Sequence, residues 1–341
     1  MKKISVLGID LGKHVFHLHG VDACGKLVLQ KKLNRNQLKR FMATIEPCLV
    51  GMEACGGAHD WARRFKEKGH RVRLVNPKFV KPFVKSNKND YLDAEAICEA
   101  VTRPCMRFVP VKSVAQQDIQ ALHRARSHFV ARRTAQANQI RGFLLEYGIV
   151  VPQGIRILRH RLPEILEDAE NPLTPDTRAL LAMLREELVH LDARVAWFDQ
   201  RILALGRDHE ACRRLQTIPG VGPVIATAVV AAVGDGSTFG NARQLAAWLG
   251  LVPRHRGTGG RTVLLGISKR GDAYLRMLLI HGARAALRFA VKRNDRRGQW
   301  LAALVQRRGK NVAIVALANR IARTIWALLS HGTTYQPGYA R

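Results

Sequence analysis

Four acidic residues stand where an apolar strand ends or a helix begins. Asp10 closes the first apolar run of the chain, and Glu53 closes the fourth. Asp90 and Asp93 are three residues apart at the predicted start of a helix, so both face one direction. Two hard divalent cations need several oxygen ligands, which these acids can supply from three elements. The pattern predicts a catalytic site with two Mg²⁺ ions, held by Asp10, Glu53, Asp90 and Asp93.

Each acid also has an ordinary explanation when it is taken singly. Asp10 can cap a turn, Glu53 can be a surface charge, and Asp90 with Asp93 can be an acidic first helical turn favoured by capping and by the helix dipole. Taken together these explanations weaken, because a lone charge at the end of an apolar strand is costly. The chain is also poor in acids, with 26 Asp and Glu against 56 Lys and Arg.

A second candidate chemistry lies in the glycine-rich segment 253–261. We expect a flexible loop here, in which the Thr258 hydroxyl is a nucleophile for phosphoryl transfer. Three cations surround it and can neutralise charge in the transition state: Arg254, Arg256 and Arg261. Two alternatives stay open, since Thr258 can be a turn residue without a chemical role and Ser268 offers another hydroxyl.

The charge of the chain predicts a polyanionic partner. Its 341 residues carry a formal net charge of +30, and the sequence pI is near 11.0. Self-repulsion of this size opposes folding, and the phosphates of a nucleic acid would relieve it. No uninterrupted apolar run approaches the roughly 20 residues needed to span a bilayer. We therefore expect a cytoplasmic, nucleoid-associated bacterial protein that binds no membrane and whose six cysteines are reduced and buried.

The first part of the chain, residues 1–112, alternates strand and helix patterns. Three short apolar strands follow one another, and helices then separate two further strands. This order predicts an α/β domain with an RNase H-like fold. The expected strands are 4–10, 15–21, 26–33, 48–53 and 71–77, and the expected helices are 36–44 and 59–68.

Residues 113–208 read as a long helical segment. Leucines and other apolar residues recur at steps of three and four in helices 114–147 and 177–206, which suits a coiled coil or an antiparallel helical pair. The intervening stretch 151–175 contains several prolines and is expected to be a turn or a partly ordered linker. The apolar stripe can serve intramolecular packing or a dimer seam, and the sequence does not separate the two.

A mainly α-helical domain is expected over residues 209–332, followed by a tail, 333–341. Gly220 and Gly222 lie in a Pro-Gly-Val-Gly turn between two helices, which favours a helix-hairpin-helix that presents backbone N–H groups to a phosphate. A simple tight helical turn is the alternative. Further helices are expected at 241–249, 272–289 and 309–329. Across the chain, nucleic-acid contacts are predicted at Lys13, Lys88, Gly220, Gly222, Arg254, Arg256, Arg261, Lys269 and Arg270.

An ordered set of motifs resembles a known family. These motifs are Gly8-Ile9-Asp10-Leu11-Gly12-Lys13, Met52-Glu53-Ala54-Cys55-Gly56, Asn87-Lys88-Asn89-Asp90-Tyr91-Leu92-Asp93-Ala94, Gly250-Leu251-Val252-Pro253-Arg254 and Gly266-Ile267-Ser268-Lys269-Arg270-Gly271-Asp272. Together they resemble the DEDD transposases of insertion sequence 110, in particular the insertion sequence 1111 subgroup. The similarity covers almost the whole chain.

The resemblance implies a RuvC-like N-terminal domain, a helical coiled-coil segment and a C-terminal transposase domain. It also implies an element-encoded bridge RNA that pairs with donor and target DNA, and a homodimer that assembles into a tetramer. In that family a serine hydroxyl of the C-terminal domain links covalently to DNA. Here Thr258 stands at the serine position, and its extra methyl group restricts approach.

Three competing functions remain at this stage. A structure-specific nuclease of the Holliday-junction-resolvase type would use the same acids with a metal-activated water, but would leave the Arg-rich glycine segment without chemistry. An actin-like sugar kinase or chaperone ATPase also carries a Gly-Ile-Asp-Leu-Gly motif, yet Lys13 and His14 replace its usual small hydroxyl residues. A non-enzymatic packaging protein would account for the charge alone.

Overall fold

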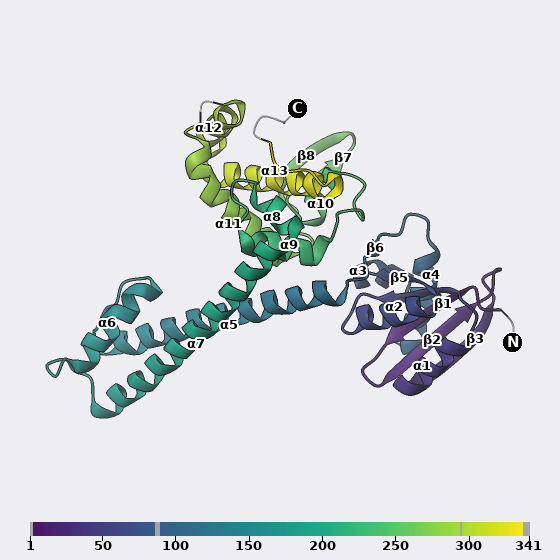
Figure 1. Cartoon of the computed structure of the whole chain (residues 1–341), viewed down its shortest axis with the longest axis horizontal. Helices are drawn as coiled ribbons and strands as arrows, with labels where there is room; N and C mark the ends of the chain where they lie inside the picture. Colours follow the sequence, from purple (N-terminus) through teal and green to yellow (C-terminus); the bar gives the residue numbers. More distant parts are fainter. Residues whose placement is uncertain (1–2, 86–88, 294, 337–341) are drawn as a thin grey trace. The chain divides into compact units, whose positions relative to one another are not determined.

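The computed structural model describes residues 3–85, 89–293 and 295–336. The chain divides into two compact units, Met1–Ser113 and Val114–Arg341, which are described separately below (Figure 1). The first unit holds a mixed sheet covered by helices, and the second is mostly helical. Of the six cysteines, which are all free, Cys24, Cys55 and Cys105 are exposed, so the expectation that the thiols are buried was wrong for half of them.

A six-stranded sheet forms the first unit, in the order β3-β2-β1-β4-β5-β6. The first three strands are antiparallel, β4 and β5 run parallel to β1, and β6 returns antiparallel at the edge. The predicted three-strand meander followed by helix-linked parallel strands is confirmed, and the short edge strand β6 was missed. The strands are β1 (Val6–Leu11), β2 (Val15–Val21), β3 (Leu27–Asn34), β4 (Leu49–Glu53), β5 (Arg71–Val75) and β6 (Phe108–Val109).

Two helices cover one face of this sheet. Alternate strand residues, among them Leu7, Ile9 and Met52, form a core with apolar side chains of α1 (Arg35–Thr44) and α2 (Ala58–Glu67). Asn34 begins α1 with a capping box, in which its side chain accepts a hydrogen bond from the backbone of Gln37. Trp61 of α2 packs in this core, where its ring stacks on Phe65 and contacts Phe16 edge to face.

The opposite face of the sheet is covered by α4 (Asp90–Thr102). Two glycines permit this contact: a Cβ atom at Gly8 would lie 2.1 Å from the Ala94 carbonyl oxygen, and one at Gly51 would lie 2.5 Å from a Val101 methyl group. Either side chain would push the helix away, so Gly8 and Gly51 set the depth at which α4 lies on β1 and β4. A short helix α3 (Pro77–Val80) and a 3₁₀ turn η1 (Lys81–Phe83) precede the described start of α4.

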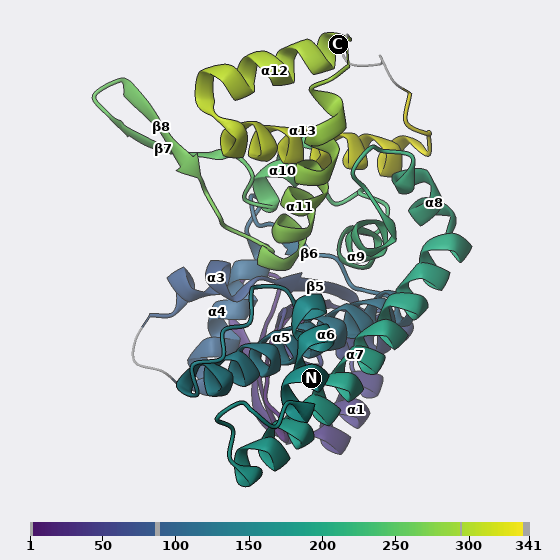
Figure 2. The ribbon, with the colours of Figure 1, turned by 90° about the vertical axis from the view of Figure 1, so that its left-hand side faces the viewer.

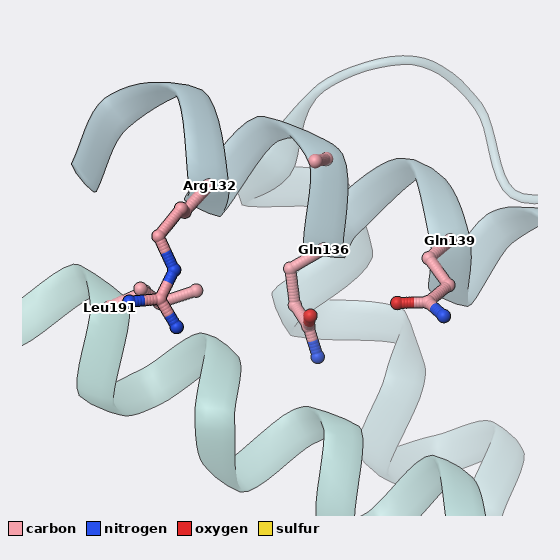
Figure 3. A pocket seen from close by; sticks show the side chains of 5 residues that line it. Arg132, Gln136, Gln139 and Leu191 are labelled. Atoms are coloured by element: carbon pink, nitrogen blue, oxygen red, sulfur yellow. The ribbon is translucent and has the colours of Figure 1, made fainter. Parts of the chain in front are cut away.

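In the second unit, α5 (Val114–Glu146) and α7 (Pro175–Asp208) pack against each other over part of their length (Figure 1). Their ion pairs run in opposite order, from Arg126 with Asp199 to Arg133 with Asp192, so the two helices are antiparallel. Figure 3 shows Arg132, Gln136 and Gln139 of α5 projecting toward the neighbouring helix along a shallow hollow of about 380 Å³. The Gln136 amide donates to the Leu184 carbonyl, 3.1 Å away. These polar contacts fix the register of the pair.

The stretch 151–175 contains a helix, α6 (Ile155–Glu167), so the expectation of a turn or linker was wrong. Leu158, Leu162 and Ile165 are buried at helical spacing against α5 and α7. This packing stabilises the helix even though Pro163 lies inside it and cannot donate a backbone hydrogen bond.

The remaining helices surround a separate apolar core. They are α8 (Glu210–Gln216), α9 (Pro223–Val233), α10 (Ala242–Trp248), α11 (Ala273–Ala290), α12 (Arg296–Arg308) and α13 (Lys310–His331). Among the described residues, α13 alone is long and apolar enough to cross a membrane, but half of its most apolar window is buried inside the unit. Its buried side chains, such as Leu317, Ile321 and Ile325, recur at helical spacing in the core, as expected of a core helix.

A buried histidine connects α5 to this core. The His123 ring lies between Thr227 of α9 and Tyr274 of α11, with nitrogen to oxygen distances of 2.9 and 3.0 Å. Thr227 already donates its hydroxyl hydrogen to the Pro223 carbonyl, so His123 Nε2 donates to Thr227 and Nδ1 accepts from Tyr274. Burial lowers the pKa of His123 to about 4, which keeps the ring neutral.

Candidate active site

Asp10 and Glu53 come together because their strands are parallel neighbours. Ile9 of β1 pairs with Met52 of β4, and the two acids follow these partners directly. Each acid also stands two residues after a glycine, Gly8 or Gly51, that contacts α4. Since strand side chains alternate between faces, both carboxylates lie on the face covered by α4. In both strands a glycine is followed two residues later by an acid. This repeated pattern could have indicated from the sequence that both acids share the face that α4 covers, but the prediction did not use it.

Helix α4 brings the other two acids to the same face. Asn89 caps the helix by accepting a hydrogen bond from the Tyr91 backbone N–H, so Asp90 and Asp93 fall in the first turn. Carboxylates are stabilised there by the positive end of the helix dipole. The structure thus places all four predicted acids around one edge of the sheet, with Asp90 the most exposed of them.

His17 is a neighbour of this site that the sequence interpretation missed. It pairs with Asp10 across β1 and β2, and it is buried. Its Nδ1 atom lies 3.6 Å from a carboxylate oxygen of Asp90, and its ring meets Tyr91 edge to face at 4.7 Å. The alternation of β2 would have placed His17 opposite Asp10 once the register of the two strands was known.

The four carboxylates influence one another electrostatically. Burial raises the pKa of Asp10, and the nearby charges of Asp93 and Asp90 raise it further. Burial also raises the pKa of Glu53, with added repulsion from Asp10 and Asp93. Across the described part of the chain, no three His, Cys, Asp or Glu side chains are close enough together to hold a metal ion as placed. A crowded, partly desolvated set of carboxylates nevertheless has the donor chemistry that suits a hard divalent cation.

Segment 253–261 forms the first strand and the turn of a two-stranded hairpin, so the expectation that it is a loop was wrong. The strands are β7 (Pro253–Thr258) and β8 (Arg261–Ile267), and Figure 2 shows them extending away from α10 and α13. Gly259 and Gly260 both have positive φ, 55° and 79°, which suits the tight two-residue turn between strands of this twist.

Thr258 shares one face of the hairpin with two arginines. It pairs directly with Arg261 across the strands, and Arg256 lies two residues earlier on the same strand. Cross-strand partners and residues two apart point to the same face, so the hydroxyl shares this face with the side chains of both arginines. Arg254 is exposed nearby at the base of β7, where a register irregularity interrupts the pairing.

Ser268, the alternative hydroxyl, is in a different environment. Its Oγ atom is buried and has no hydrogen-bond partner among the described residues. The backbone around it is tightly held: Lys269 has a positive φ of 53°, and Gly271 approaches α10 so closely that a Cβ would lie 1.8 Å from the Trp248 carbonyl oxygen. In this geometry Thr258 is open to a substrate and Ser268 is not.

The other predicted nucleic-acid contacts are in mixed environments. Lys13, Lys269 and Arg270 are exposed. Gly220 faces inward, since a Cβ there would lie 2.6 Å from the Gly282 carbonyl oxygen of α11, whereas Gly222 at the start of α9 borders open space. Helices α8 and α9 flank this turn, and its use as a nucleic-acid-binding helix-hairpin-helix stays a prediction. Lys88 lies outside the described residues.

Comparison with known proteins covers both units. A family model of transposases matches residues 7–149, which include all four acids. A second model, described as the IS116/IS110/IS902 transposase family, matches residues 212–299, which include the hairpin with Thr258. Each model therefore spans one of the two candidate chemical groups.

Several bacterial relatives match along nearly their full length. The chain is 50% identical to a "Probable family 20 transposase" of Pseudomonas aeruginosa over 98% of this chain and 99% of that protein. It is 47% identical to the transposase of insertion sequence element IS1111A of Coxiella burnetii, over 99% and 93%. It is 42% identical to the transposase of IS1328 of Yersinia enterocolitica, over 98% and 99%. The predicted resemblance is confirmed: the chain belongs to the IS110 family of DNA transposases, in the IS1111 subgroup.

Proposed function

We propose that this transposase cuts and joins the DNA strands of its mobile element by metal-dependent phosphoryl transfer. Asp10, Glu53, Asp90 and Asp93 would hold two Mg²⁺ ions. The observation that carries this proposal is the placement of four acids from three elements near the carboxyl ends of β1 and β4, where burial and mutual repulsion raise the pKa of Asp10 and Glu53. When bound, the ions would polarise the phosphate and stabilise the leaving oxygen.

Thr258 is the proposed nucleophile. Its Oγ1 atom would bond to phosphorus while the bond from phosphorus to a sugar oxygen breaks, leaving a DNA strand attached to the protein and a free sugar hydroxyl. Attack by a DNA hydroxyl on that phosphorus would then release Thr258 and join the strands. Arg256 and Arg261, on the same hairpin face, would neutralise charge as it develops on the phosphate oxygens. Support comes from the exposed position of Thr258 and the buried hydroxyl of Ser268.

The partners follow from the family and the charge. The proposed substrates are the element's ends and a target DNA, and the proposed guide is a bridge RNA encoded beside the gene. A homodimer that assembles into a tetramer, working in the bacterial cytoplasm at the nucleoid, would bring Thr258 to an acidic site. The net charge of +30 supports contact with more nucleic acid than one short duplex.

Trapping the covalent intermediate tests the nucleophile. Purified transposase, with RNA transcribed from the flanking DNA, is incubated with a nicked DNA that carries the element's end, and the modified peptide is mapped by mass spectrometry. We expect an adduct on Thr258 that is kept in Thr258→Ser and lost in Thr258→Ala, with nucleic-acid binding unchanged. An adduct on Ser268, or full joining by Thr258→Ala, would remove Thr258 from the mechanism. Cleavage without any adduct would favour a nuclease that uses water.

A further inference from the structure

A cluster of four arginines lies on α12 and α13, away from the hairpin and its turn. Its members are Arg296 and Arg297 of α12 with Arg320 and Arg323 of α13. The two helices pack against each other within the second unit (Figure 2). Burial lowers the pKa of Arg320, and the like charges of Arg297, Arg323 and Arg296 lower it further. The cations are thus close enough to repel one another.

The acid next to the arginine cluster in sequence, Asp295, is paired with another residue and does not form an ion pair with the cluster. Asp295, at the start of α12, accepts from the Gly298 backbone N–H and forms an ion pair with Arg293 at 2.7 Å. Among the described residues, none of the four arginines of the cluster forms an ion pair. Like charges gathered without counterions on a folded surface are the arrangement that binds phosphate groups.

The arginine cluster also contains aromatic groups. The Arg320 guanidinium lies over the Trp300 ring, 5.4 Å from its centroid, and Trp300 remains 38% exposed. Arg297 donates to the Tyr335 hydroxyl at 2.7 Å, while its Nε atom is buried without a hydrogen-bond partner in the described chain. A guanidinium on an indole face, with part of the ring open, offers a surface on which an unpaired base can stack.

We propose that the arginine cluster with Trp300 is a binding site for an unpaired stretch of nucleic acid. The arginines would hold successive phosphates, and Trp300 would stack on a base. A duplex hides the faces of its bases, so the site should prefer single strands or loops to paired segments. The site rests on the proposed function only in that its ligand is nucleic acid, and it does not depend on Thr258 or on the acids.

Binding measurements on the full chain test the arginines. Fluorescent 12-nucleotide dT and rU strands and a 12-base-pair duplex are titrated by anisotropy from 0.05 to 0.3 M salt. For Arg320→Gln/Arg323→Gln, we expect the slope of log affinity against log salt to fall by about 1.4, and single-strand affinity to drop about tenfold at 0.15 M. The control Arg307→Gln/Arg308→Gln removes the same charge from the exposed end of α12 and should change both values by less than half as much.

Trp300→Leu tests stacking separately. It should weaken single-strand binding at least about fivefold, leave the salt slope unchanged and spare the duplex. A larger loss for rU than for dT would assign the site to RNA, and the reverse would assign it to DNA. The proposal would be overturned by any of three results: an equal loss of affinity in Arg307→Gln/Arg308→Gln, an unchanged affinity in Arg320→Gln/Arg323→Gln, or no effect of Trp300→Leu on single-strand binding. Arg323→Gln alone repeats the test on an exposed side chain if the double variant does not fold. Cleavage plays no part in these readouts, so they stand apart from the nucleophile experiment.

Discussion

Asp10 and Glu53 directly follow buried strand residues, Ile9 and Met52, whereas Thr258 ends a strand in which all six residues are exposed. The acids are positioned by a core, by two glycines and by a helix that rests on them. The hydroxyl is positioned by a two-stranded hairpin with no apolar layer beneath its tip. The acidic site is therefore held in place by packing on both faces of a sheet, whereas the Thr258 hydroxyl stands on a surface that is open to solvent.

The largest effect is expected for Asp10→Asn. It should lower strand cleavage at least about a thousandfold, because the proposed metal site would lose a ligand. It should leave the free energy of unfolding unchanged or higher, since one charge is removed from a crowded group. Cleavage assays with Mg²⁺ and chemical denaturation measure the two quantities. Glu46→Gln, which changes an exposed acid paired with Lys3, is the control. Near wild-type cleavage by Asp10→Asn would show that the acidic site is misassigned.

Gly8→Ala tests the rigid side of the comparison. The new Cβ would lie 2.1 Å from the Ala94 carbonyl oxygen, so α4 must move, and we expect a loss of about 3 kcal/mol or more in unfolding free energy together with reduced cleavage. Gly56→Ala adds the same methyl group in open space within the same unit and should cost far less. If the two variants unfold at the same denaturant concentration, the close approach of α4 does not position the acids.

The dependence of the unfolding free energy on pH tests the core of the second unit, in which His123 is buried, without involving the hairpin. The folded pKa of His123, about 4, is lower than the 6.5 expected of the unfolded chain, so the unfolded chain takes up a proton first as the pH falls. The stability from the neutral ring is complete above pH 6.5 and is lost as the pH falls toward 4, by about 3 kcal/mol in all. His123→Gln should remove this part of the pH profile. An unchanged profile would show that the ring protonates freely in the folded protein.

The smallest effect is expected at the hairpin turn. Gly260→Ala places a side chain where φ is +79°, which should cost about 1 kcal/mol locally. Protection of β7 and β8 amides from hydrogen exchange should fall about fivefold, while global unfolding stays the same. Gly266→Ala, in the same hairpin but in open space and without a positive φ, should leave protection unchanged. A global loss of stability would contradict the view that the hairpin folds apart from the core.

The N-terminal site was largely predictable from local pattern. Strands that end in an acid, and two acids at a helix start, are short-range signals, and parallel strands bring such ends together. His17 was missed because its closeness to Asp90 depends on the register of β1 and β2, which the residue pattern does not state. The strand conformation of Thr258 was missed for a similar reason. Glycine and arginine are weak indicators of a strand in a sequence, and here the pairing with β8 stabilises the strand.

Among the helices that escaped prediction, α6 and α12 did so for different reasons. Pro163 pointed to a break, but burial of Leu158 and Leu162 outweighs the missing hydrogen bond in α6. Helix α12 begins and ends with arginines, and its buried residues, Gly298, Leu301 and Leu304, give only a short apolar pattern. In both cases tertiary packing, which a single sequence does not display, decides the secondary structure.

The hairpin of β7 and β8 has a further consequence for the behaviour of the protein in solution. Both of its strands are edges, and Val263, Leu264 and Leu265 of β8 are exposed side by side. Such a strand is a template on which strands of other molecules can add, which leads to aggregation. Arg256 and Arg261 oppose this by electrostatic repulsion between copies. Neutralising these arginines should therefore lower the solubility of the free protein, so that a loss of activity in such variants must be measured on the fraction that remains monodisperse.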